Sequence, residues 1–165
     1  MQNYMRLSVS GDIKEAIRTY GYKNCGLRYE DVCKKIRNII TTKKRHISNP
    51  LSEHDRSKLN SEWDREKNGF LNKLFEEEGF INKCIPKKYT NNPSLNELLS
   101  KHIDFCKKKD ERLSALQKKS EYSACKQYNR WIDAQRTAFT LEYLKNAKTF
   151  KSQNVDKYFI TFISI

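Results

Sequence analysis

Apolar residues recur at intervals of three and four along much of this chain, which is the spacing that places them on one face of an α-helix. The first ten residues carry little of this pattern, and a short helix is predicted over residues 13–20. From Tyr29 to Ile40 the spacing is continuous and predicts a longer helix. Residues 41–50, which end in Asn-Pro, predict a loop.

The middle of the chain carries signals for the start and the end of helices. Ser52 opens the pattern S-x-x-D, in which the serine hydroxyl accepts a backbone N–H of the first turn. The dipeptide Asn68-Gly69 predicts a break or kink. Gly79 predicts a helix end, because glycine commonly follows the last helical residue.

Two further helices are predicted in the C-terminal half. Ser94 and Glu97 fit a capping box, with serine at the N-cap and glutamate three residues later. Helical spacing continues to Cys106, and a last long helix is predicted from about Ser120 to Phe150. With five glycines and three prolines the chain favours long helices. We therefore expect an all-α fold, a disulfide-stabilised bundle of about four to five helices.

We expect a single helical, cysteine-rich domain over residues 1–157, because no linker rich in Gly, Ser or Pro divides the chain. Its expected core includes Trp63, Phe70, Phe75, Leu98, Trp131 and Phe139. Residues 158–165 form an apolar tail, which is too short to cross a bilayer and marks a candidate truncation point. Neither a signal peptide nor a transmembrane segment is predicted.

The charge balance is strongly basic, with 33 Lys and Arg against 20 Asp and Glu and a formal net charge of +13 at pH 7. Such a charge attracts polyanions, including nucleic acid and sulfated glycans. A compositional bias toward residues with AT-rich codons is the simpler source of many lysines. The basic residues also fall in short, dispersed clusters and not in one stripe, which disfavours nucleic acid as the partner.

The five cysteines are candidates for structural disulfides: Cys25, Cys33, Cys84, Cys106 and Cys125. Two disulfides with one remaining thiol suit an extracellular protein, and the sequence does not choose among the connectivities. The alternative is that unpaired cysteines pack as small apolar residues. No C-x-x-C pair or zinc-like histidine spacing is present in the sequence, so no metal site is predicted.

The sequence has no nucleophile elbow, phosphate-binding glycine loop, zinc-protease helix or EF-hand loop. The acidic run Glu76-Glu77-Glu78 is more simply a solvated charge balance than an acid–base pair. His102, on the apolar face of its helix, is more simply a hydrogen-bonded core histidine. The prediction is a non-enzymatic interaction domain with no catalytic residues and no cofactor.

The most distinctive segment covers residues 125–139 and has the pattern C-x-x-Y-x-x-W-I-x(6)-F. Its defining residues are Cys125, Tyr128, Trp131, Ile132 and Phe139. This pattern resembles the cysteine-rich ectodomains of the SURFIN, subtelomeric transmembrane protein and VIR (PIR-type) surface antigens of malaria parasites (Plasmodium). The segments Phe75–Cys84 and Phe105-Cys106 are compatible with the same domain, and the resemblance covers most of residues 25–150.

The resemblance implies structural roles and no ligand contacts for the matching residues. The implied disulfide cysteines are Cys84, Cys106 and Cys125, and the implied core residues are Tyr128, Trp131, Ile132 and Phe139. It also implies export to the infected red cell, surface or membrane association, and a part in host-cell or immune interaction and antigenic variation. Full-length members continue into a transmembrane segment, so membrane association is expected only through a segment missing from this chain.

Three functional hypotheses follow. The leading one is a surface antigen or adhesin domain with a host protein or anionic glycan and antibodies as partners, and no small-molecule substrate. The alternative is an intracellular basic helical protein that binds nucleic acid nonspecifically. The third is an assembly or trafficking protein without a host receptor. Phosphate binding should weaken steeply with salt, which separates the first two.

Overall fold

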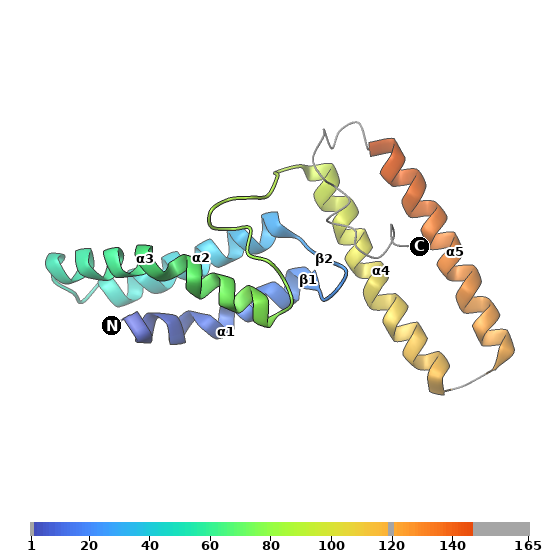
Figure 1. The fold of residues 1–165 in the computed structure, drawn as a ribbon, viewed down its shortest axis with the longest axis horizontal. Coiled ribbons are helices and arrows are strands. Elements are labelled where there is room, and N and C mark those ends of the chain that lie inside the picture. Colours follow the sequence, from blue (N-terminus) through green and yellow to red (C-terminus); the bar gives the residue numbers. More distant parts are fainter. Residues whose placement is uncertain (1, 119–120, 147–165) are drawn as a thin grey trace. The chain divides into compact units, whose positions relative to one another are not determined.

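The computed structural model describes residues 2–118 and 121–146, and these residues are predominantly helical (Figure 1). The helices are α1 (Gln2–Tyr20), α2 (Tyr29–Ser48), α3 (Glu53–Glu77), α4 (Pro93–Lys118) and α5 (Tyr122–Asn146). Two short strands, β1 (Gly21–Tyr22) and β2 (Gly26–Leu27), pair in a two-stranded sheet. The predicted all-α fold class with about four to five helices is confirmed.

The chain forms two compact units. Unit 1 consists of residues 1–23 and 29–90 and contains α1, α2 and α3. Unit 2 consists of residues 24–28 and the chain from 91 onward, and contains β2, α4 and α5. The boundary falls within ordered turns and loops, so no flexible linker marks it in the sequence. The predicted apolar tail, 158–165, lies outside the described residues.

The N-terminal helix α1 begins well before the predicted position. It packs against both α2 and α3. The side chains that it buries share one face and are Met5, Val9, Ile13, Ala16 and Ile17. Ser10 and Gly11 lie between the first two of these and the rest, and they obscure the helical period in the sequence. Tertiary contact on two sides outweighs their weak helix propensity.

The loop predicted over residues 41–50 is mostly wrong, because α2 continues to Ser48. Residues 41–48 contain no glycine or proline, so nothing in the backbone ends the helix before Asn49-Pro50. The predicted cap at Ser52 is confirmed, since its Oγ accepts the backbone N–H of Asp55 at 3.2 Å. The predicted break at Asn68-Gly69 does not occur, and α3 is continuous.

The end of α3 at Gly79 is confirmed, and it has the geometry of a Schellman motif. Gly79 has a φ of 83° and donates its N–H to the carbonyl of Glu76 at 3.0 Å. The N–H of Phe80 reaches the carbonyl of Phe75 at 2.8 Å. The positive φ is the reason that glycine, which has no Cβ, stands at this position.

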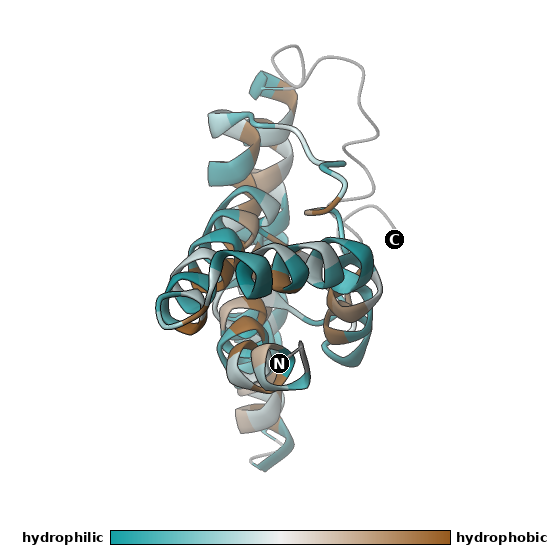
Figure 2. Ribbon diagram, turned by 90° about the vertical axis from the view of Figure 1, so that its left-hand side faces the viewer, coloured by the Kyte–Doolittle hydropathy of each residue, from teal (hydrophilic) through white to brown (hydrophobic). Residues whose placement is uncertain are grey.

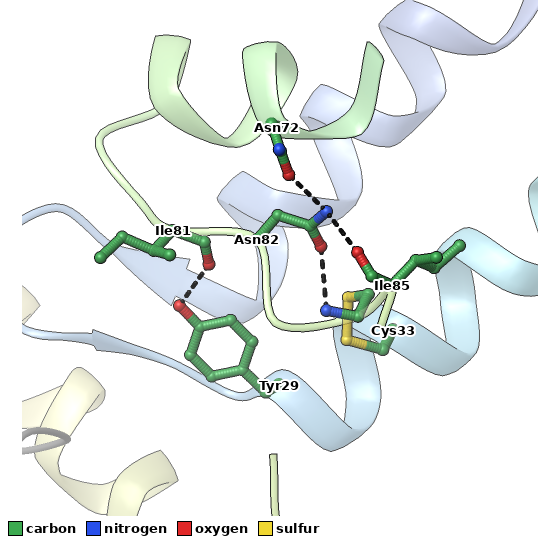
Figure 3. Close-up of a disulfide and its surroundings, with 7 residues drawn as sticks. Tyr29, Cys33, Asn72, Ile81, Asn82 and Ile85 are labelled. Carbon is green, nitrogen blue, oxygen red and sulfur yellow. Dashed lines mark hydrogen bonds between the residues drawn. A yellow bond between two sulfur atoms is a disulfide. The ribbon is translucent and has the colours of Figure 1, made fainter. Parts of the chain in front are cut away.

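Within unit 1, several hydrogen bonds join the long loop that follows α3 to α2 and α3 (Figure 3). The side chain of Asn82 donates to Asn72 Oδ1 at 2.8 Å and accepts the N–H of Cys84 at 2.9 Å. Tyr29 Oη, at the start of α2, donates to the carbonyl of Ile81 at 2.7 Å. These bonds hold the segment that carries Cys84 against α2 and α3.

In unit 2, α4 begins at Pro93, two residues before the predicted first helical position. Asn92, and not Ser94, is the capping residue: its Oδ1 accepts the N–H of Leu95 at 3.1 Å. Pro93 then occupies the first helical position, where its missing N–H costs nothing.

Figure 2 shows hydrophobic and hydrophilic segments alternating along the helices.

The predicted core is only partly confirmed. Trp63, Phe75 and Leu98 are buried, whereas Phe70, Trp131 and Phe139 are half-buried. No described residue of α5 is fully buried. Helix α5 packs extensively only on α4 within unit 2, and contact on one side leaves its aromatic residues partly open to solvent.

Candidate functional site

Four of the five cysteines form two disulfides, one inside each unit. Cys33 of α2 pairs with Cys84 in unit 1, with a Cα–Cα distance of 5.2 Å (Figure 3). Cys25 pairs with Cys106 of α4 in unit 2, with a Cα–Cα distance of 6.4 Å. All four cysteines are buried. The inner pair is enclosed in sequence by the outer pair.

Cys125 is the unpaired cysteine, and this corrects the disulfide role that the resemblance implied for it. It lies exposed in the first turn of α5. Burial distinguishes it from the other cysteines. The four paired cysteines are buried within their units, whereas Cys125 is exposed to solvent.

His102 lies beside the disulfide of unit 2 and is fully buried, as predicted for a core histidine. Its Nε2 is 3.9 Å from Cys106 Sγ, one helical turn further along α4. Burial lowers the pKa of His102 to about 4, and the positive charge of Lys109 acts in the same direction. The ring also packs against Phe139 of α5, with 5.4 Å between the ring centroids.

The aromatic residues of the sequence pattern form a seam between α4 and α5. Trp131 stacks on Phe105 of α4 at a centroid distance of 5.4 Å, and Tyr128 lies 6.1 Å from Trp131. Tyr128, Trp131, Ile132 and Phe139 are all half-buried, so the core role implied for them is corrected to a helix–helix contact at the surface of unit 2.

Two open grooves, each of about 260 Å³, follow this seam. The first is lined by Lys101, Asp104, Phe105, Lys108, Gln135, Ala138, Phe139 and Glu142. The second is lined by Arg112, Ala115, Leu116, Ala124, Gln127 and Tyr128. Both grooves contain an aromatic ring; the first also has groups of both charges, whereas among the described residues that line the second only Arg112 is charged.

The cations of the first groove are partly compensated. Lys101 Nζ lies 2.7 Å from Glu142 Oε1 of α5 and 3.2 Å from Glu97 Oε1 of its own helix. Hydrogen bonds to these two carboxylates raise the pKa of Lys101. The groove is therefore suited to a partner with both polar and apolar groups, and it is a poor match for a run of phosphates.

Away from the seam, α5 exposes two large apolar side chains. Leu141 is 65% exposed and Leu144 is 62% exposed, and their spacing of three places them on adjacent turns of the helix. Single exposed leucines are ordinary on protein surfaces. Because residues two apart on an α-helix do not face each other, these leucines lie on a different face of α5 from Phe139 and Tyr143.

In unit 1 the acidic run Glu76-Glu77-Glu78 binds α1. Glu77 lies 2.5 Å from Lys14 Nζ, which lowers the pKa of its carboxyl through a hydrogen bond. Glu78 accepts two hydrogen bonds from the guanidinium of Arg18, at 2.7 and 2.8 Å. Two of the three carboxylates therefore join helices by ion pairs.

One group of potential metal ligands occurs among the described residues: Cys25, His102 and Cys106. The sequence does not predict this group, because Cys25 is 77 residues away from His102 and the three residues match no standard zinc-binding spacing. A usable signal was present, since histidine and cysteine four residues apart share one face of a helix.

No protein-family model, no curated protein and no solved structure matches this chain. Within the described ranges, none of the helices combines the length and apolar character that a membrane span requires.

Proposed function

We propose that this chain is a non-enzymatic interaction domain of a surface antigen or adhesin. The family proposed is the SURFIN, subtelomeric transmembrane protein and VIR (PIR-type) group of malaria parasites. In this role it is exported to the infected red cell and takes part in host-cell or immune interaction and antigenic variation. The family assignment rests on the sequence pattern of residues 125–139.

The observation that carries the proposal is that each unit contains a buried disulfide. Disulfides persist in oxidising environments, such as the cell exterior, and are rare where glutathione keeps thiols reduced. A chain with one cross-link in each of its two units suits a life outside the reducing cytosol. This favours the surface role over the intracellular alternative.

The α4–α5 seam is the proposed contact surface for a host protein. Aromatic residues and arginine dominate the binding energy of many protein interfaces, and the seam contains Trp131, Tyr128 and Arg112. The exposed Leu141 and Leu144 add apolar area on the opposite face of α5. A mixture of aromatic, apolar and charged groups is typical of a protein-binding surface.

The alternative, nonspecific binding of nucleic acid, is favoured by the net charge of +13. Binding of that kind depends on cations that are free to displace counterions from phosphates. Several cations here already pair with carboxylates: Lys101 with Glu142, and Arg18 with Glu78. We therefore place nucleic acid second.

The test compares the binding of the oxidised chain to red-cell membranes, to a heparin-type sulfated glycan and to duplex DNA. Each measurement is made at about 50 and about 200 mM salt, because phosphate binding weakens by orders of magnitude across this range. The proposal predicts that binding to red-cell membranes or to the glycan exceeds binding to DNA at the higher salt concentration. Binding to DNA alone, lost at the higher salt concentration, would favour the alternative.

A surface variant tests the contact surface. We expect Leu141→Ser combined with Leu144→Ser to weaken membrane or glycan binding about tenfold or more, since interface anchors cost 1–2 kcal/mol or more when truncated. Leu7→Ser is the matched control, because Leu7 is a leucine of α1 that is 79% exposed and lies in the other unit. Equal binding by both variants would remove the exposed leucines of α5 from the proposed contact surface.

A further inference from the structure

Cys25, His102 and Cys106 converge at one buried point of unit 2. Their ligand atoms, two Sγ and one imidazole nitrogen, all lie within 4.8 Å of one another. His102 and Cys106 are one turn apart on α4, and Cys25 reaches them from the segment 24–28. Each of the three is buried.

We propose that these three side chains bind one Zn²⁺ ion when the Cys25–Cys106 disulfide is reduced. The same residues would then close unit 2 in either of two ways, as a disulfide under oxidising conditions or as a thiolate–imidazole zinc site under reducing conditions. This inference concerns the chemistry of unit 2 and does not rest on the proposed surface role.

The distances suit zinc. Zn–S bonds of about 2.3 Å and Zn–N bonds of about 2.0–2.1 Å, at tetrahedral angles, place a sulfur and a nitrogen ligand about 3.6 Å apart. His102 Nε2 and Cys106 Sγ are 3.9 Å apart. Once the disulfide is broken, rotation about the side-chain bonds of Cys25 and Cys106 separates the two sulfurs to the spacing that the ion requires.

The ligand types also select the metal. Two cysteine thiolates and one histidine are a soft donor set that suits Zn²⁺ and not Mg²⁺ or Ca²⁺, which prefer oxygen ligands. Three protein ligands leave one tetrahedral position for a fourth ligand. Burial of the ligands favours retention of the ion over exchange with solvent.

The change from disulfide to zinc site is balanced in electrons and protons when a dithiol is the reductant. The dithiol attacks the Cys25–Cys106 bond and leaves as its own cyclic disulfide, so two electrons pass to the chain and two thiols form. Zn²⁺ then displaces the two thiol protons into solvent as the S–Zn bonds form. His102 contributes the lone pair of one ring nitrogen.

The second cysteine pair provides an internal control. Cys33 and Cys84 are also buried and paired, yet within the described residues neither belongs to a group of three potential ligands. Cys125 is a single exposed thiol. Bound zinc should therefore slow the alkylation of only two of the five thiols of the reduced chain, those of Cys25 and Cys106.

The test uses the full chain, reduced with a dithiol and transferred to metal-free anaerobic buffer. Zn²⁺ is added, thiols are alkylated for increasing times, and each cysteine is followed by peptide mass spectrometry. We expect one bound Zn²⁺ per chain and alkylation of Cys25 and Cys106 slowed by about tenfold or more. Cys33, Cys84 and Cys125 should react as before, and a chelator should abolish the difference.

Two variants complete the test. His102→Gln removes the nitrogen ligand and should weaken zinc affinity about tenfold or more, since even the loss of an outer-shell partner costs 10–100-fold. Cys33→Ser combined with Cys84→Ser should leave zinc binding and the protection of Cys25 and Cys106 intact. Protection that is equal at all five cysteines, absent at Cys25 and Cys106, or unchanged in His102→Gln would overturn the proposal.

Discussion

Arg112 of α4 lies over the indole ring of Trp131 of α5, with its guanidinium carbon 4.2 Å from the ring centroid. Phe105 stacks on the same indole, one part of a seam that continues to Tyr128. The most distinctive sequence pattern of the chain thus forms a half-open contact between two helices. Its aromatic residues join α4 to α5 and remain partly accessible to a partner.

This position of Trp131 predicts a moderate cost of truncation. Trp131→Ala should lower the free energy of unfolding by about 2 kcal/mol, because a half-buried ring loses part of the 3–5 kcal/mol typical of a buried one. Phe75→Ala, at a fully buried position of α3, should cost about 3–5 kcal/mol. Urea unfolding of the two variants checks the order, and equal costs would mean that Trp131 is a core residue.

Replacement by alanine should have opposite effects on stability at Gly69, inside α3, and at Gly79, just after its end. Gly79→Ala should destabilise the chain by about 1–2 kcal/mol, because φ is +83° there and a Cβ would lie 3.2 Å from Lys23 Cγ. Gly69→Ala should stabilise it by about 0.5–1 kcal/mol, since Gly69 is in the helix interior with nothing within 4 Å of an added Cβ. Thermal unfolding measures both, and a shift in the same direction for both would contradict the assigned helix end.

Loss of either disulfide should destabilise the oxidised chain by about 3–4 kcal/mol on the chain-entropy model. The sequence separations are 81 residues for Cys25–Cys106 and 51 for Cys33–Cys84. Because the second loop lies inside the first, the outer bond closes only the remaining residues when the inner one is present. The pairs Cys25→Ala/Cys106→Ala and Cys33→Ala/Cys84→Ala are compared by urea unfolding, with Cys125→Ala as the control that should change little.

The buried His102 predicts a loss of stability in mild acid. Its folded pKa of about 4 is below the ordinary value of 6.5, so below pH 6.5 the unfolded chain takes up a proton that the folded chain excludes. The contribution of neutral His102 to the free energy of unfolding is complete above about pH 6.5. It decreases as the pH falls toward 4, and about 2–3 kcal/mol is lost by pH 4.5.

His102→Gln isolates this effect. The lowered pKa values of Asp64 and Glu77 also reduce stability in acid, but they act at lower pH and are common to both proteins. Unfolding free energies at about pH 7.5 and pH 4.5 should therefore differ by about 2–3 kcal/mol less in the variant than in the wild type. The same pH dependence in both proteins would exclude His102 as the cause.

Local signals predicted the helices and several of their ends. The hydroxyl of Ser52 and the positive φ of Gly79 act within a few residues, so the sequence pattern contains the whole cause. Where two local signals competed, the prediction failed: Ser94 fits a capping box, but Asn92 followed by Pro93 caps α4 first. Helix α2 continues to Ser48 because the Asn-Pro signal ends the helix only at Asn49, and the residues before it tolerate a helix.

Features that depend on distant residues were not predictable from spacing. The pairing of Cys25 with Cys106 is set by the contact of β2 with α4, across 81 residues. The half-buried state of Trp131 and Phe139 depends on how few neighbours α5 has, and an aromatic pattern carries no information about that. The same contact of β2 with α4 brings Cys25 to His102 and Cys106.

The most direct measurement is disulfide mapping of the chain isolated from its native source, by alkylation without reduction, proteolysis and mass spectrometry. A disulfide-linked interaction domain predicts peptides that join Cys25 to Cys106 and Cys33 to Cys84, with alkylated Cys125. Alkylation of all five cysteines would place the working protein in a reducing compartment and contradict the proposed surface role.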